Sequence, residues 1–211
     1  MKIFEYKNYE DYKTAQVEAN LEKQNFVWVT NFSIDEIWKR SPLASQILCH
    51  GTRNGAEQEM FSRRYRQAKV LGSEISHKAK EYPKTVEWDF NKVNEKWIGQ
   101  FDIVYTNSVD HTTTPVETIG VWLDQLAPNG TLYIDHGNKT NQTNTPITNR
   151  ATRWDPLEIM DNEMENVIKE AGGLIIETFK GKGCFRKIEE LMSDVRYIGE
   201  PTRIYAIKKL L

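Results

Sequence analysis

The stretch ILCHGTRNGAE, residues 47–57, joins an apolar run that stops at Gly51 to a helical pattern that begins after Gly55. A strand, a glycine turn and a helix in this order place backbone N–H groups where they can bind a nucleotide-like ligand. Dinucleotide-binding turns carry G-x-G-x-x-G so that the backbone can approach a pyrophosphate. This turn lacks the pattern, because Arg53 stands at the position of the middle glycine. The stretch therefore lacks the dinucleotide fingerprint, and the ligand of this turn, if it has one, has to be inferred from the rest of the sequence.

Apolar strand-like runs and helical patterns alternate on both sides of this turn. A helical pattern at 9–24 and a Ser33/Glu36 capping box precede it, and a helix at 56–66 follows. Further helices are expected at 114–126, capped by Thr114 and Glu117, and from Asp155 to Gly172. The expected strands are QILCH (46–50), KVLGSEI (69–75), VEW (86–88), FDIVYTN (101–107), TLYIDH (131–136), LIIETF (174–179) and RIYAIKK (203–209). This alternation predicts an α/β fold with a mostly parallel sheet and helices on both faces.

Composition sets limits on the class of protein. The chain has 211 residues, 39% of them hydrophobic, with six tryptophans, which is enough for the core of one domain. A net charge of −2 argues against a general nucleic-acid binder. Cys49 and Cys184 show no metal-ligand spacing, and the N-terminus has no apolar signal core, so we expect a reduced cytoplasmic protein without a membrane segment.

Polar residues gather where the predicted strands end. In an open α/β sheet, ligands bind beyond the carboxyl ends of the strands. The residues at these ends are His50 and Gly51, Glu74, Asp89, Asn107, and the pair Asp135 and His136. Glu74 ends the second of these strands, where an acid can accept both hydroxyls of a ribose, and Asp89 can accept a hydrogen from an adenine amine. A glycine turn, a ribose acid and an amine acceptor in this order describe an adenosine pocket.

The motifs resemble those of the class I S-adenosylmethionine-dependent methyltransferases across residues 45–210. The matching segments are ILCHGTRNG (47–55), VLGSEIS (70–76), VEWDF (86–90), FDIVYTNSVDH (101–111) and LAPNGTLYIDH (126–136). The resemblance implies a Rossmann-like, doubly wound, seven-stranded sheet with an antiparallel last strand. It also implies S-adenosylmethionine as the cofactor, a core at 45–211 and an N-terminal helical cap at 1–44 on the substrate side.

The resemblance also implies which part of the cofactor each of these residues would bind. Gly51 and its neighbours would bind the methionine part, Glu74 the ribose, Asp89 and Phe90 the adenine, and Asn107 and Ser108 would lie near the sulfonium. Two departures concern the methionine part: Cys49 stands where an acid is common, and Arg53 replaces a glycine. Arg53 could pair with the methionine carboxylate and Glu57 with its ammonium. The full set of expected cofactor-binding residues is His50, Gly51, Thr52, Arg53, Gly55, Glu57, Glu74, Ile75, Asp89, Phe90, Asn107 and Ser108.

Two histidines are candidates for activating an acceptor hydroxyl, which is a poor nucleophile while it is neutral. His111 and His136 each follow a strand end, and each stands beside an aspartate, Asp110 or Asp135, that could orient it. The competing interpretation is a metal site built from these two histidines, His50 and the two aspartates. We expect no metal, because the histidines show no local ligand spacing.

The sequence thus predicts methyl transfer to a small polar acceptor, such as a hydroxyl of a sugar or another metabolite. The 137–155 loop, rich in Asn and Thr, and the 180–200 connection would help to build the acceptor pocket. Three alternatives stay open: methylation of RNA or protein, a non-catalytic cofactor-binding module, and other sulfonium chemistry in the same pocket. A homodimer is also compatible with the sequence.

Overall fold

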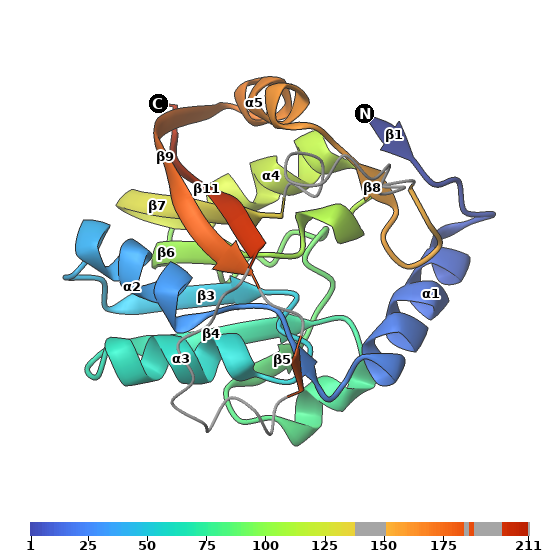
Figure 1. The fold of residues 1–211 in the computed structure, drawn as a ribbon, viewed down its shortest axis with the longest axis horizontal. Helices are drawn as coiled ribbons and strands as arrows, with labels where there is room; N and C mark the ends of the chain where they lie inside the picture. The colour runs from blue at the N-terminus through green and yellow to red at the C-terminus, as the bar shows by residue number, and fades with distance from the viewer. Residues whose placement is uncertain (138–150, 184–185, 188–199, 211) are drawn as a thin grey trace.

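Seven strands form one sheet in the order β5-β4-β3-β6-β7-β11-β9 in the computed structural model, which describes residues 1–137, 151–183, 186–187 and 200–210 (Figure 1). The first five strands in this order run parallel: β5 (Thr85–Glu87), β4 (Lys69–Glu74), β3 (Gln46–His50), β6 (Phe101–Thr106) and β7 (Leu126–His136). The last strand of the chain, β11 (Glu200–Lys209), lies antiparallel between β7 and β9 (Gly173–Gly183). This confirms the predicted mostly parallel sheet with an antiparallel last strand.

Helices cover both faces of the sheet. On one face, α2 (Asn31–Arg40) and α3 (Ala56–Arg64) pack Ile34, Ile37 and Phe61 against β3 and β6. On the other face, α4 (Pro115–Asp124) and α5 (Asp161–Glu170) form a second cluster that includes Trp122 and Ile168. All five of these side chains are essentially removed from water, which is the main stabilising contribution to such a core.

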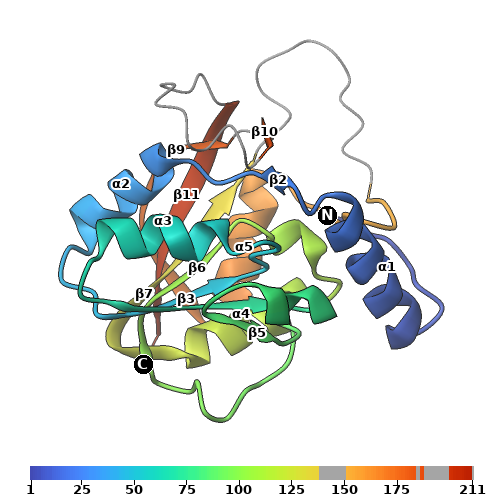
Figure 2. The same ribbon diagram turned by 90° about the horizontal axis from the view of Figure 1, so that it is seen from below.

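Helix α1 (Tyr9–Glu22) stands beside the end of the sheet where the parallel strands finish (Figures 1 and 2). Asn8 caps it by accepting a hydrogen bond from Asp11 N at 3.0 Å. Its buried side is small and polar, with Tyr12, Gln16 and Asn20 among the buried residues. The helix at 9–24 is therefore confirmed, and its polar side faces the interior.

Short elements tie the N-terminal region to the rest of the chain. Strand β1 (Lys2–Ile3) pairs antiparallel with β8 (Leu157–Glu158), and β2 (Phe26–Val27) pairs antiparallel with β10 (Arg186–Lys187). Two 3-10 helices, η1 (His77–Glu81) and η2 (Val109–His111), follow β4 and β6. Helix α2 shares a hydrophobic cluster with β3 and so packs as part of the core. Within residues 1–44, α1 is the helix that stands apart from the core as a cover. The predicted division of the chain at residue 44 stays a prediction.

Two predicted helix starts and one predicted helix cap are wrong. Helix α2 begins before Ser33, because the Thr30 hydroxyl caps it by accepting from Ser33 N at 3.4 Å. Helix α5 begins at Asp161 instead of Asp155, because residues 157 and 158 pair with β1. Thr114 makes no side-chain cap bond to α4; its hydroxyl lies 3.3 Å from the Thr118 hydroxyl.

Cys49 is a buried free thiol, whereas Cys184 and most of the Asn/Thr-rich stretch lie outside the described residues. Within the described part of the chain, none of the helices has both the length and the apolar character needed to cross a membrane.

Candidate functional site

A cleft lies between α1 and the carboxyl ends of β3, β4 and β6. Its cavity volume is about 40 Å³. The sheet side contributes Gly51, Arg53, Glu74, Ile75, Asp89, Phe90 and Ser108, and the opposite side contributes Tyr12, Gln16, Ala19, Asn20 and His111. The strand ends therefore bring together most of the residues that the sequence assigned to a cofactor.

The glycine turn has the backbone that the sequence implied. Gly51 has φ +68°, and a Cβ there would lie 2.6 Å from Ser108 Oγ, so no other residue fits. Gly55 has φ +79° and precedes the first residue of α3. Arg53 itself adopts a positive φ of 46°. The arginine thus has a backbone conformation that favours glycine, and it adds a cation at the wall of the cleft.

Glu74 connects the turn to the second strand of the pocket. Its carboxylate accepts from Arg53 N at 2.9 Å and from Ser76 N at 3.0 Å. Burial raises the pKa of Glu74, and these two backbone N–H groups oppose the rise. Each carboxylate oxygen still has lone pairs for further donors, so the group can also accept from the hydroxyls of a ribose.

Asp89 is held by α1 and by its own loop. Its Oδ2 accepts from Tyr9 Oη at 2.8 Å, and its Oδ1 accepts from both the backbone N and the side-chain Nδ2 of Asn91. Tyr12 donates its hydroxyl to the carbonyl of His111 at 3.0 Å. Helix α1 therefore closes over the adenine end of the expected pocket through tyrosine hydroxyls.

Glu57, Thr52 and Asn107 lie behind the turn, outside the cleft wall. Glu57 is buried on the first turn of α3, and Asn107 Nδ2 donates to its Oε1 at 3.3 Å. Burial raises the pKa of Glu57 to about 7. Thr52 is fully buried and accepts from Gln58 Nε2 at 3.1 Å. Of these three, Glu57 is the one with an ionisable group directly beneath the turn.

His50 belongs to the core and does not line the cleft. Its Nδ1 lies 2.7 Å from Ser73 Oγ, its Nε2 lies 2.8 Å from Gln125 Oε1, and its ring stacks on Trp122. Burial lowers the pKa of His50 to about 4, so the ring is neutral near pH 7. The structure therefore does not support a side-chain contact between His50 and a cofactor.

Replacing His50 with phenylalanine should lower stability while leaving cofactor affinity within about threefold of wild type. The ring shape is kept, but Ser73 and Gln125 lose their partner, which should cost about 2 kcal/mol. Urea unfolding measures the loss of stability, and calorimetric titration with S-adenosylhomocysteine measures affinity. A variant of unchanged stability that no longer binds the nucleoside would instead restore His50 to the cofactor site.

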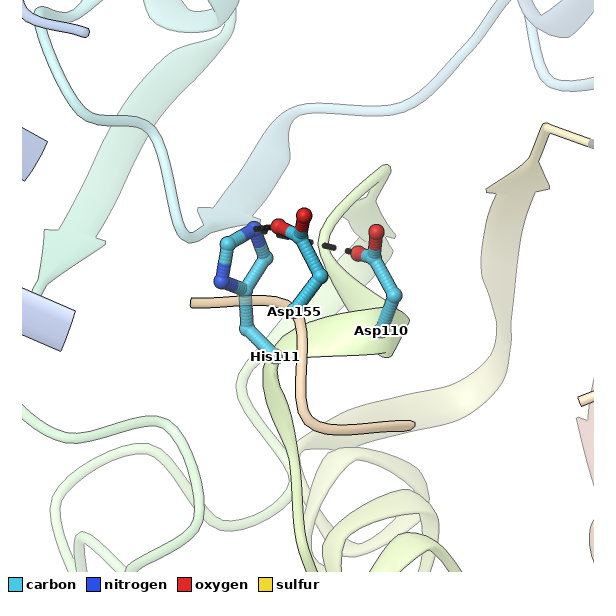
Figure 3. Close-up of side chains that lie close together, drawn as sticks. All are labelled: Asp110, His111 and Asp155. Atoms are coloured by element: carbon cyan, nitrogen blue, oxygen red, sulfur yellow. Dashed lines mark ion pairs between the residues drawn. The ribbon is translucent and has the colours of Figure 1, made fainter. Parts of the chain in front are cut away.

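His111 lies at the open side of the cleft among two carboxylates. Its Nε2 is 3.7 Å from Asp155 Oδ1 and 3.8 Å from Asp110 Oδ1 (Figure 3). Its Nδ1 is 2.7 Å from Gln16 Oε1. Asp110 and His111 come from η2, and Asp155 comes from a distant segment of the chain. The predicted Asp110–His111 pair is thus present and has a third member.

The predicted pairing of Asp135 with His136 is wrong. Adjacent residues of a strand point to opposite faces of the sheet, so the two side chains diverge. Asp135 faces the α2 side, where Tyr105 Oη donates to it at 3.4 Å and burial raises its pKa to about 6. His136 faces the other side, where its Nε2 lies 3.3 Å from the carbonyl of Ile159. Burial lowers the pKa of His136, with the charge of Asp110 opposing the change.

Comparison with solved structures supports the fold, whereas comparison of the sequence finds no match. The sequence matches no protein-family model and no curated protein. Among solved structures, it is similar to a phosphoethanolamine N-methyltransferase 2 from Haemonchus contortus in complex with phosphomonomethylethanolamine and S-adenosylhomocysteine. That match has TM-score 0.61 and 12% identity, covering 97% of this chain and 61% of the other.

Two further structures extend this comparison. A TehB-like S-adenosylmethionine-dependent methyltransferase from Corynebacterium glutamicum matches with TM-score 0.55 and 16% identity, covering 95% of this chain and 98% of that one. The [4+2]-cyclase SpnF matches with TM-score 0.58 and 14% identity, covering 84% of this chain and 80% of the other. The chain has the class I methyltransferase fold.

Within this methyltransferase fold, Asn20 is the clearest sign that the cleft fits a polar ligand. Its side chain is 5% exposed and lines the cleft. Neither its Nδ2 nor its Oδ1 has a hydrogen-bond partner among the described residues. Buried polar groups are nearly always paired, so a ligand with both a donor and an acceptor suits this position.

Sequence reasoning missed Asp155 and Tyr9 as parts of the site. The sequence pattern predicts Asp155 as a helix cap, and no local spacing connects it with His111. Tyr9 could have been found from the helical pattern, because it lies one turn before Tyr12 on the side that faces the cleft.

Proposed function

We propose that the protein is an S-adenosylmethionine-dependent methyltransferase that acts on a small polar acceptor, with a hydroxyl of a sugar or another metabolite as the favoured group. The observation that carries the proposal is the content of one cleft. The glycine turn, Glu74 and Asp89 line it together, in the order that an adenosine with a methionine tail requires.

The cofactor side follows from the contacts described above. Glu74 accepts from the ribose hydroxyls, while Asp89 and Phe90 enclose the adenine. Gly51 lets the ligand approach the backbone beside Ser108, and Arg53 supplies a positive charge at the cleft wall for the carboxylate of the amino-acid group. Glu57, buried behind the turn, supplies the negative charge that the ammonium group would have to reach. When bound, S-adenosylmethionine supplies an electrophilic methyl group on its sulfonium.

The acceptor side is the edge of the cleft at His111. Helix α1 covers the cleft and limits access of water, which strengthens electrostatic interactions inside it. The Nε2 edge of His111, with Asp110 and Asp155, is the titratable group that faces an incoming acceptor. We assign activation of the acceptor hydroxyl to this edge. His136 and Asp135, buried on opposite faces of β7, have supporting roles only.

A second candidate function is other chemistry in the same pocket. It is favoured by one observation, since the fold neighbours include a [4+2]-cyclase. Binding of the nucleoside alone therefore does not separate the two functions, and turnover has to be measured.

Calorimetric titration with S-adenosylmethionine and S-adenosylhomocysteine tests the proposal. We expect micromolar dissociation constants, on the order of −8 kcal/mol. Transfer of a labelled methyl group to the small-molecule fraction of a metabolite extract should follow. Label in RNA or protein would change the acceptor class, and binding without transfer would favour the cyclase-like or non-catalytic alternative. Folded protein that binds neither nucleoside would refute the proposal.

A further inference from the structure

A chain of hydrogen bonds orients the imidazole of His111, and a role in proton transfer alone does not explain this orientation. The amide of Gln16 has a fixed orientation, because its Nε2 donates to Trp154 O at 3.4 Å and to Tyr6 Oη at 3.3 Å. The tyrosine hydroxyl can accept there, since its own hydrogen is donated to Arg153 O at 2.6 Å. The amide oxygen of Gln16 must therefore face the imidazole.

This orientation fixes the tautomer of His111. An amide oxygen only accepts, so His111 Nδ1 carries the hydrogen in their 2.7 Å hydrogen bond. In the neutral ring the Nε2 lone pair then points toward Asp110 and Asp155. A lone pair that faces two carboxylates is repelled by both, and a cation between the three groups would relieve this repulsion.

We infer that Asp110, His111 and Asp155 form a site for a divalent transition-metal ion. Their ligand atoms all lie within 4.8 Å of one another, and each residue is only partly exposed. Donors bonded at 2.0–2.2 Å around a tetrahedral ion are separated by about 3.4 Å. The imidazole–carboxylate separations of 3.8 Å and 3.7 Å exceed this by a few tenths of an ångström, and the two carboxylate oxygens, which lie within 4.8 Å of each other, have to approach further. One imidazole and two carboxylates suit Mn²⁺ or Zn²⁺ better than Mg²⁺.

Gln16 has the position of an outer-sphere residue for such an ion. A metal-binding histidine usually donates its second N–H to an oxygen, which fixes the ring and increases its basicity. Here the carbonyls of Arg153 and Trp154 orient Gln16, and the next residue is the ligand Asp155. The same short segment therefore supplies one ligand and orients another.

One cation already lies nearby and sets a limit on affinity. Lys23 Nζ is 3.6 Å from Asp155 Oδ1, the oxygen that faces His111. Lys23 sets one positive charge against the two carboxylates. A metal ion would have to compete with Lys23, so removal of its charge should strengthen metal binding.

The role of the ion rests on the proposed function. His111 lines the cleft, so an ion on its Nε2 lies at the acceptor edge. There it would bind an acceptor hydroxyl and lower the pKa of that hydroxyl as a Lewis acid. His111 would then act as a metal ligand and not as a general base.

Electron paramagnetic resonance and calorimetric titration with Mn²⁺ test the site on full-length protein freed of metal with a chelator. We expect one ion per chain, with Zn²⁺ competing and Mg²⁺ much weaker. His111→Gln and Asp155→Asn should each weaken binding at least tenfold, as should Gln16→Leu. Lys23→Gln should strengthen it about threefold. His77→Gln, which replaces an exposed histidine on η1, is the matched control and should bind Mn²⁺ like wild type.

Titration of every variant with S-adenosylhomocysteine separates this inference from the proposed function. Wild-type protein that binds the nucleoside but no metal would overturn the metal site. Stoichiometric metal binding that survives both His111→Gln and Asp155→Asn would also overturn it. Metal binding without nucleoside binding would support the site and refute the proposed methyltransferase.

Discussion

Replacing Glu74 with alanine is expected to weaken binding of S-adenosylhomocysteine by about 100-fold, since two hydrogen bonds from ribose hydroxyls to a charged group contribute about 3 kcal/mol. The same carboxylate also holds the glycine turn, through Arg53 N at 2.9 Å and Ser76 N at 3.0 Å. Alanine removes the acceptor for the ligand and the acceptor for the turn together. Calorimetric titration measures the loss.

Two variants separate these contributions. Glu74→Gln keeps one oxygen as an acceptor, so affinity should fall by less than with alanine. Glu87→Gln is the matched control, because Glu87 lies directly beside Glu74 in the register of β5 and β4 but pairs with Lys80 at the surface. It should bind like wild type. If Glu74→Ala bound the nucleoside with unchanged affinity, the adenosine pocket would have to be placed elsewhere.

Much of the cofactor side of the cleft could be predicted because it depends on local patterns. Gly51, Glu74 and Asp89 each follow a short apolar run, and parallel strands bring such ends to one edge of the sheet. The place of these residues at the ends of predicted strands was therefore enough to put them at one cleft. Even the unusual Arg53 stays within the pattern, since it adopts the positive φ of a glycine.

The acceptor side was harder to predict because it depends on side-chain direction and on distant contacts. Side chains alternate between the two faces of a strand, so Asp135 and His136 of β7 point in opposite directions. A pairing inferred only from their adjacency in the sequence therefore fails. His50 stands at a strand end, yet its ring turns inward to Ser73 and Gln125, a partner that only the fold brings close. Asp155 reaches His111 through a tertiary contact that leaves no spacing signal in the sequence.

Replacing Glu57 with glutamine should stabilise the protein increasingly as pH rises, by about 3 kcal/mol at pH 8. Burial raises the pKa of Glu57 from its ordinary value of 4.5 to about 7, and its Oε2 has no hydrogen-bond partner among the described residues. The folded protein therefore binds a proton here more tightly than the unfolded chain does. Wild-type stability from this group is complete below about pH 4.5 and is lost as pH rises through about 7. Glutamine does not titrate, so the two proteins should be similar near pH 4.5 and differ most at pH 8.

Urea unfolding between pH 5 and 8 measures this difference, and taking the difference cancels the opposite contribution of buried His50. Glu59→Gln is the matched control, because Glu59 lies on the same helix, is 59% exposed and pairs with Arg63. It should show no growing gain with pH. A constant difference between Glu57→Gln and wild type across this range would contradict the raised pKa.

Retention of a destabilising buried acid requires a reason, and the proposed function supplies one. An ionised Glu57 beneath the glycine turn would bind the ammonium group of the methionine part under the proposed function. Glu57→Gln should therefore bind S-adenosylhomocysteine at least tenfold more weakly, about 1.4 kcal/mol, while its affinity for methylthioadenosine, which lacks the amino-acid group, stays unchanged. A variant that is more stable but binds more weakly is expected where a functional site keeps a destabilising group because that group binds the ligand. Equal losses for both nucleosides would instead mean that Glu57 only shapes the turn.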